Sequence, residues 1–202
     1  MLSATQPTIV YALRGLAYFE LRVYGPKQDL HSGIYGGVVH NPAQALAELI
    51  AGMHDAGGRV TLPGFYDKVR ELDAEERAEL ARLSTEKTLV TRAGVSKLWG
   101  EQEFTPTERL GARPTLEING LYSGFVGAGA KTVLPAYAMA KISTRLVPDQ
   151  ESTEIKSQLE AYLKANAPDT IRWELKEVTD SSNASISDRN SRWVQAMMQA
   201  QE

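Results

Sequence analysis

Apolar and polar residues alternate in several short segments of the chain. In the first segment Phe19, Leu21 and Val23 occupy one side and polar or amphipathic residues the other. This two-residue period is typical of a strand with one buried face. We predict four such strands, at residues 17–24, 116–121, 136–147 and 170–178.

Two other segments repeat their apolar residues at helical spacing. Asn41-Pro42 combines a capping residue with proline at the first helical position, and the pattern then continues until Gly57-Gly58. Residues 151–166 carry a second apolar stripe, with acidic residues near the positive end of the helix. The resulting order favours the α+β class, as a ferredoxin-like βαββαβ sandwich. Both helices would cover one face of a four-stranded antiparallel sheet.

Residues 57–113 separate the first helix from the second strand, a connection far longer than the ~2–8 residues that are usual. Within this insertion, the segment 73–83 is predicted to be helical, with Asp73 as cap and Glu76 at the capping-box position. The face of this helix is mostly charged. We therefore favour a solvated helical arm over an insertion that shapes a substrate entrance.

Composition narrows the range of partners. The 202 residues carry a net charge of -3 and contain no cysteine. Without a basic patch, nucleic acid and anionic membranes are poor partners. No apolar run approaches the ~18 residues of a membrane-spanning helix, and the first residues lack the features of a secretion signal. We expect a soluble, cytoplasmic protein with no nucleic-acid or membrane partner.

Three residues in loops or at strand ends can bind an anionic substrate. His31 lies in a glycine-bounded loop after the first strand, where its imidazole can donate to an oxyanion. Arg145, near the end of the third strand, can clamp a carboxylate from the face opposite the apolar one. Thr132 offers a hydroxyl that can equally cap a turn. Exposed loop histidines and strand arginines without any function are the alternative.

Three ordered motifs contain these residues: Asp29-Leu30-His31-Ser32-Gly33 with a following Gly-Gly pair, the segment 129–135, and the segment 141–148 with its Arg-Leu-Val-Pro. Together they resemble the lid, or dimerisation, domain of the dinuclear zinc peptidase family. That family includes carnosinase-like dipeptidases, aminoacylases and glutamate carboxypeptidases, and the dipeptidase branch is the most similar. The resemblance extends from about Pro7 to about Trp193.

The resemblance implies specific roles within a homodimer. His31 would act in trans, stabilising the oxyanion in the partner subunit's active site, while Arg145 and Thr132 would hold a peptide with a free C-terminal carboxylate. The parent protein would be a metal-dependent dipeptidase or exopeptidase with two divalent metal ions, zinc in this family, in its catalytic domain. Dimerisation is expected through the first helix and an edge strand.

The metal-ligand motifs of that family are absent from this sequence. Its members use His-x-Asp and Glu-Glu, whereas Asp29-x-His31 has the reverse order and Glu75-Glu76 lies in the charged arm. We expect no metal bound by this chain and no activity without a catalytic domain. The lid would cover 15–180, and its ends, 1–14 and 181–202, would be stubs of the missing catalytic domain. The second stub begins an amphipathic helix that needs a surface to pack on.

A freestanding ferredoxin-like module that binds amino acids or RNA is the alternative reading. An RNA-binding sheet would display several stacking aromatics on its open face, whereas the third strand offers only Tyr137. An amino-acid module would also be a dimer with a ligand site on a loop. The unfinished C-terminal helix and the long insertion favour the lid.

Overall fold

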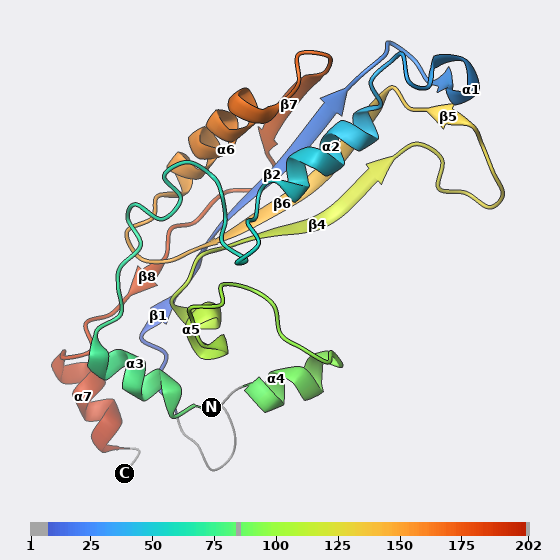
Figure 1. Cartoon of the computed structure of the whole chain (residues 1–202). Coiled ribbons are helices and arrows are strands. Elements are labelled where there is room, and N and C mark those ends of the chain that lie inside the picture. Colours follow the sequence, from blue (N-terminus) through green and yellow to red (C-terminus); the bar gives the residue numbers. More distant parts are fainter. Residues whose placement is uncertain (1–7, 84–85, 201–202) are drawn as a thin grey trace.

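The computed structural model describes residues 8–83 and 86–200. Its centre is a four-stranded antiparallel sheet in the order β4-β6-β2-β7. Helices α2 and α6 cover one face of this sheet (Figure 1). The succession along the chain is βαββαβ, so the predicted ferredoxin-like sandwich is confirmed. The sheet strands are β2 (Gly15–Tyr24), β4 (Thr115–Ser123), β6 (Tyr137–Leu146) and β7 (Arg172–Glu177).

The core forms where the apolar faces of the strands meet the two helices. Every second residue of β2 and β6 is buried, and their register pairs Phe19 with Ile142, both fully inaccessible to solvent. A shift of one residue would turn this apolar row toward solvent, so burial fixes the register. The four strands therefore lie close to their predicted positions.

The two covering helices are α2 (Pro42–Ala51) and α6 (Ser152–Asn166). Asn41 caps α2 as predicted, because its side chain accepts a hydrogen bond from the Ala43 N–H at 2.9 Å. The helix ends at Gly52 and not at Gly57. After Gly52 the chain turns back on itself, and the Thr61 hydroxyl donates a hydrogen bond to the Gly52 carbonyl at 2.5 Å.

The insertion contains α3 (Ala74–Ala81), α4 (Glu86–Ala93) and α5 (Pro106–Gly111). Asp73 caps α3, and none of the residues of this helix is buried, which agrees with a solvated arm. The start of the insertion, outside the predicted arm, is different. There, Val60, Leu62 and Phe65 are buried in the core, because the chain folds back against the sheet before it reaches α3.

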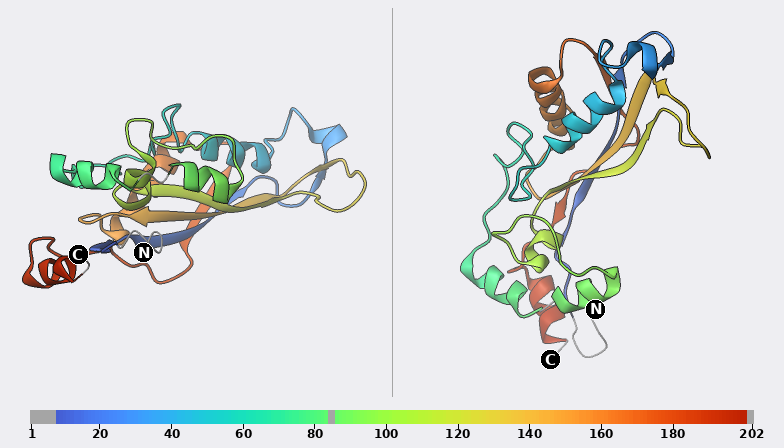
Figure 2. Two further views of the ribbon diagram at one scale, coloured as in Figure 1. Left: turned by 90° about the horizontal axis from the view of Figure 1, so that it is seen from below. Right: turned by 45° about the vertical axis from the view of Figure 1, so that its right-hand side comes forward.

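Two short sheets lie beyond opposite ends of the main sheet. At one end β3 (Leu30–His31) pairs with β5 (Val133–Leu134), next to α1 (Ser32–Tyr35). We call residues 29–38 and 124–135 the tip. At the other end β1 (Ala12–Leu13) pairs with β8 (Ser185–Ile186), followed by α7 (Arg192–Gln199). Both views in Figure 2 keep the tip and α7 far apart. Residues 1–7 of the expected first stub lie outside the described ranges.

Candidate substrate-contact site

His31 lies at the start of α1, where its side chain caps the helix. The Gly33 N–H donates a hydrogen bond to the imidazole Nδ1 at 2.9 Å. The other ring nitrogen, Nε2, is 3.3 Å from the Thr132 hydroxyl, 101 positions along the chain. Both residues are exposed. The tip thus joins two of the three predicted site residues, with polar atoms that a ligand can reach.

Backbone bonds hold the two loops of the tip together. The Ser32 N–H donates to the Thr132 carbonyl at 3.0 Å, and His31 is paired with Val133 across the β3-β5 sheet. The Asp29 carboxylate accepts a hydrogen bond from the Ala136 N–H at 2.9 Å. These bonds fix the position of Thr132 relative to the imidazole, although the sheet has only two residues in each strand.

Apolar side chains on the tip are unusually exposed. Ile34 is 70% exposed, Val38 83% and Val126 78%. Tyr35 and Phe125 of the same loops are also exposed. Apolar groups gathered around polar ones are typical of a surface that meets another protein.

Arg145 lies far from this pair. It is exposed on the sheet face opposite the helices, as predicted, and stands opposite Leu16 of β2. From Tyr137 to Arg145 the strand runs through eight residues, about 27 Å at about 3.4 Å each. The tip begins before Tyr137, so His31 and Arg145 of one chain lie at opposite ends of the sheet.

A second guanidinium accompanies Arg145. Arg14 donates to the carbonyls of Arg109 at 3.5 Å and Arg113 at 3.3 Å. Burial lowers the pKa of Arg14, and repulsion by Arg145 lowers it further, against the attraction of Glu117. Two neighbouring cations of this kind favour an anion between them. No motif in the sequence indicates Arg14.

Tyr137 is not the only aromatic residue on the open face of the sheet. Its ring lies 6.4 Å from that of Tyr24 and 6.0 Å from that of Tyr122. Tyr137 of the third strand thus has two aromatic neighbours from other strands, which the pattern of that strand alone does not indicate. The Tyr24 hydroxyl, however, donates to Glu174 at 3.1 Å, so acidic groups lie close to the rings.

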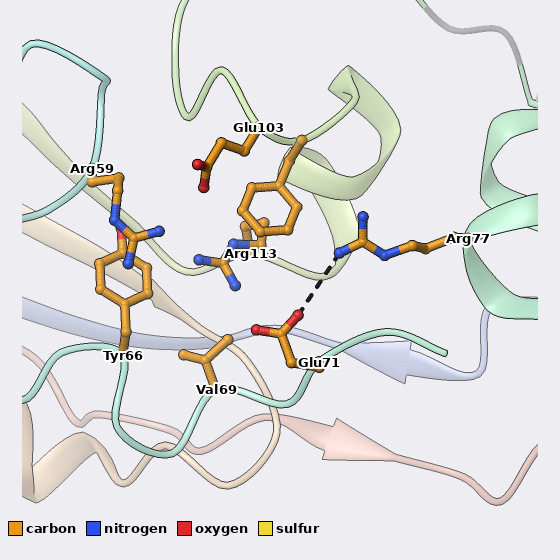
Figure 3. Close-up of a pocket in the computed structure, with 8 residues that line it drawn as sticks. Arg59, Tyr66, Val69, Glu71, Arg77, Glu103 and Arg113 are labelled. Carbon is orange, nitrogen blue, oxygen red and sulfur yellow. Dashed lines mark ion pairs between the residues drawn. The ribbon is translucent and has the colours of Figure 1, made fainter. Parts of the chain in front are cut away.

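A separate cavity of about 300 Å³ lies in the insertion (Figure 3). Arg113 is buried at its base and forms a bidentate pair with buried Glu101, at 2.5 and 3.1 Å. Its guanidinium lies over Phe104 at 4.0 Å and over Tyr66 at 5.0 Å. Arg59 stacks on the same Tyr66 ring at 4.3 Å. We call these five residues the arginine–aromatic cluster.

The charges of this cavity are largely balanced inside the chain. Burial would raise the pKa of Glu101, but hydrogen bonds from Arg113 and Tyr66 bring it below its usual range. Arg77, at the edge, pairs with Glu71 at 3.7 Å and with Glu108 at 3.5 Å. These ion pairs hold the segments of the insertion together, and they leave few charged groups unpaired that could bind a ligand.

Within the described ranges, no group of three or more metal-ligating side chains converges. The two remaining histidines are engaged separately: His40 Nδ1 lies 2.7 Å from the Thr170 hydroxyl, and the His54 ring meets Trp99 edge-on at 5.2 Å. Among the same residues, no helix is long and apolar enough to cross a membrane.

Comparison with known proteins identifies the class. The sequence profile of the peptidase dimerisation domain matches residues 11–171. The chain belongs to this family, which confirms the expected resemblance and disfavours the freestanding binding module.

Proteins with similar sequences are dipeptidases by name. The Cys-Gly metallodipeptidase DUG1 of Candida albicans is 33% identical over 181 residues, covering 86% of this chain and 37% of that protein. The human Beta-Ala-His dipeptidase is 31% identical over 164 residues, covering 81% of this chain and 32% of its own length.

Among solved structures, the M20 family metallo-carboxypeptidase Sso-CP2 of Sulfolobus solfataricus superimposes with a TM-score of 0.80 at 33% identity, over 96% of this chain and 50% of that one. Human carnosine dipeptidase 1 gives a TM-score of 0.76 at 27% identity, over 96% and 42%. The chain thus spans half or less of the length of these relatives.

Proposed function

We propose that this chain is the lid and dimerisation domain of a metal-dependent dipeptidase that hydrolyses dipeptides or short peptides with a free C-terminal carboxylate. The family match and the relatives named as a metallodipeptidase and a dipeptidase support the class of reaction. The residue roles depend on one observation: His31 and Thr132 share the tip, whereas Arg145 stands at the opposite end of the sheet.

The separation has a direct consequence for how a substrate is held. A dipeptide spans at most about 7 Å when extended. The distance of about 27 Å along β6 is several times larger. His31 and Arg145 of one chain therefore cannot bind the same dipeptide. Two subunits are needed, with the tip of one completing a site that contains Arg145 of the other.

The end of the sheet that carries Arg145 is suited to a site completed by the tip of a second subunit. Both ends of the described chain run past β1 and β8, on the side of Arg145 and away from the tip. A catalytic domain attached there would face its own Arg145. We infer that residues 15–180 form the lid and that 1–14 and 181–202 belong to the catalytic domain.

A surface for dimerisation lies along the β4 edge of the sheet. Leu121 is opposite Ala140, on the helix side of β4, yet it is 63% exposed. The outward side of α2 presents the small residues Ala47 and Ala51 to solvent. An unpaired edge strand beside a flat helix face is suited to pairing with a second copy. The proposed partner is thus a homodimer mate.

In the assembled site the side chains of this chain would act by hydrogen bonding and charge. The imidazole would bind the oxygen on which negative charge develops, and Thr132 beside it would hold the substrate. Arg145 would bind the substrate carboxylate through its two-pronged guanidinium. The described residues do not fit the two divalent ions, zinc in our expectation, that such enzymes use as Lewis acids. Those ions would be held by the catalytic domain. The lid alone would be inactive, and we place the enzyme in the cytoplasm.

Complementation between inactive subunits tests this proposal. Full-length protein with His31→Ala is mixed, by denaturation and renaturation, with full-length protein whose metal site has been removed by substitution in the catalytic domain. In the mixed dimer one site has its metals and receives an intact His31 from the partner. Because one of its two sites would work, a mixed dimer should regain about half the activity of a wild-type dimer. If mixing restores nothing while mixed dimers are present, the trans role of His31 is refuted.

A further inference from the structure

The hydrogen bond between Gly33 and His31 determines which ring nitrogen carries the proton. A backbone N–H is only a donor, so the Nδ1 atom that receives it at 2.9 Å must present a lone pair. A neutral imidazole has one protonated nitrogen and one bare nitrogen. With Nδ1 bare, the proton of the neutral ring is on Nε2.

We infer that Gly33 is a positioning residue that holds His31 as its Nε2–H tautomer, so that the outward nitrogen is a hydrogen-bond donor. This inference rests on the proposed function, because a donor at this point is useful only if the imidazole meets an oxyanion or carbonyl oxygen. The opposite tautomer would present a lone pair to that oxygen, and the contact would be repulsive.

The surroundings of Nε2 agree with a donor. Its nearest polar partner is the Thr132 hydroxyl at 3.3 Å, a long contact with an oxygen that can accept. Both side chains are exposed, so a substrate oxygen can approach from solvent and accept a hydrogen bond from the Nε2–H group. The Thr132 hydroxyl would then be free to donate in the same direction.

The identity of residue 33 matters for the same reason. A Cβ atom at this position would lie 2.7 Å from the His31 Cε1 and 3.0 Å from its Nδ1. The obstructed group is the end of a side chain, and not backbone, so the ring can turn away without unfolding the loop. Gly33→Ala should therefore keep the fold and break the bond between the amide and the imidazole.

Nitrogen-15 NMR of the histidine rings tests the inference on the chain itself. The tautomer ratio of His31 is read from two-bond proton–nitrogen spectra, at a pH where the ring is neutral. Exposed neutral histidine already favours Nε2–H, so a histidine-containing peptide in the same buffer sets the baseline. We expect His31 to be almost wholly Nε2–H in the wild type and to return to the baseline ratio in Gly33→Ala.

Gly111→Ala is the matched control, because a Cβ at Gly111 meets no atom within 4 Å. It should leave the His31 ratio at the wild-type value. A wild-type ratio equal to that of the peptide, or a ratio unaffected by Gly33→Ala, would overturn the inference. Neither result depends on catalytic activity.

Kinetics of the full-length enzyme separate this inference from the proposed function. We expect Gly33→Ala to lower kcat by about tenfold to a hundredfold, since a displaced catalytic group loses its alignment, with KM changed less. Gly111→Ala should keep wild-type kcat. If His31→Ala leaves kcat unchanged, the proposed role of His31 fails, whatever tautomer the spectra show. If His31→Ala is inactive but Gly33→Ala keeps both full kcat and the wild-type tautomer, only the positioning role is lost.

Discussion

The tip and the arginine–aromatic cluster use polar groups in opposite ways. In the cluster, Arg113 and Glu101 are both buried and satisfy each other with two hydrogen bonds between aromatic rings. In the tip, His31 and Thr132 are exposed and share one long contact of 3.3 Å. Groups whose partners are complete within the chain stabilise the fold, whereas groups left incomplete are available to a ligand. The arginine–aromatic cluster, although it carries more charge than the tip, therefore stabilises the fold and does not bind a ligand.

The largest expected effect is on the cluster. Arg113→Met should lower the free energy of unfolding by about 3–5 kcal/mol, because it leaves the buried Glu101 carboxylate without its partner. Urea denaturation followed by circular dichroism measures this change. Combining Arg113→Met with Glu101→Leu should recover most of the loss, since an apolar pair replaces the ion pair. Arg77 is itself 42% exposed, and Glu108 keeps its hydrogen bond from the Thr105 N–H, so Arg77→Met should cost only about 1 kcal/mol. An Arg113→Met protein as stable as the wild type would contradict this account.

The tip should show the reverse behaviour. His31→Ala in the full-length enzyme should lower kcat by about a hundredfold to a thousandfold, the usual loss when one oxyanion donor is removed. The unfolding free energy should fall by only about 1 kcal/mol, because the side chain is exposed and caps a helix of four residues. Steady-state kinetics and denaturation on the same preparation give both values. A large loss of stability with little loss of kcat would place His31 with the structural residues.

Arg145 should affect binding of the substrate more than the chemical step. Loss of a charged hydrogen bond costs about 1.5–3 kcal/mol, so Arg145→Met should raise KM by roughly tenfold to a hundredfold. Arg145→Lys keeps the charge but not the two-pronged geometry, so its KM should lie between those of the wild type and Arg145→Met. Peptides with an amidated C-terminus provide the control, because the substitution should barely affect them. Equal effects on acid and amide substrates would refute a carboxylate contact.

The dimer surface can be tested on the chain alone. Ala47→Glu places a charge on the outward side of α2, and light scattering should report a shift from dimer toward monomer. Ala161→Glu, an exposed alanine on α6, makes the same change away from the β4 edge and should keep the mass of the wild type. If the wild type is a dimer and both variants, or neither, differ from it in solution mass, the interface lies elsewhere.

The smallest effect concerns pH. Burial lowers the pKa of His54, partly opposed by attraction from Glu117 and Asp55. Between this lowered value and about 6.5, the value of an unfolded histidine, the unfolded chain binds more protons than the folded chain. Stability should therefore decrease as the pH falls below about 6.5. The melting temperature of His54→Gln should depend less steeply on pH in that window, and an unchanged slope would count against this role.

Local patterns predicted the sheet because burial acts on every second residue. Phe19 and Ile142 mark the core face, and their alternation can be read without knowing the fold. The helix α5 was missed although its signal is present: Thr105 and Glu108 form a capping box around a proline. That signal lies in a segment too short for an apolar stripe to be recognised.

Sites formed by distant residues could not be predicted from spacing. The contact between His31 and Thr132 spans 101 positions and exists only because β3 and β5 pair. The residues themselves were found through resemblance and not through geometry. Arg14 and the pair of Arg113 with Glu101 carry no motif, since their partners come from tertiary packing alone.

The pairing of β1 with β8 has a consequence for how such a domain can be exchanged between proteins. Ala12 stands opposite Ile186, so the chain enters and leaves through two points about 5 Å apart. A surface turn of almost any host provides anchor points at that spacing, and insertions at such sites are well tolerated. We therefore expect that the segment between these strands can be deleted from a host protein, or inserted into one, with little change to the host backbone.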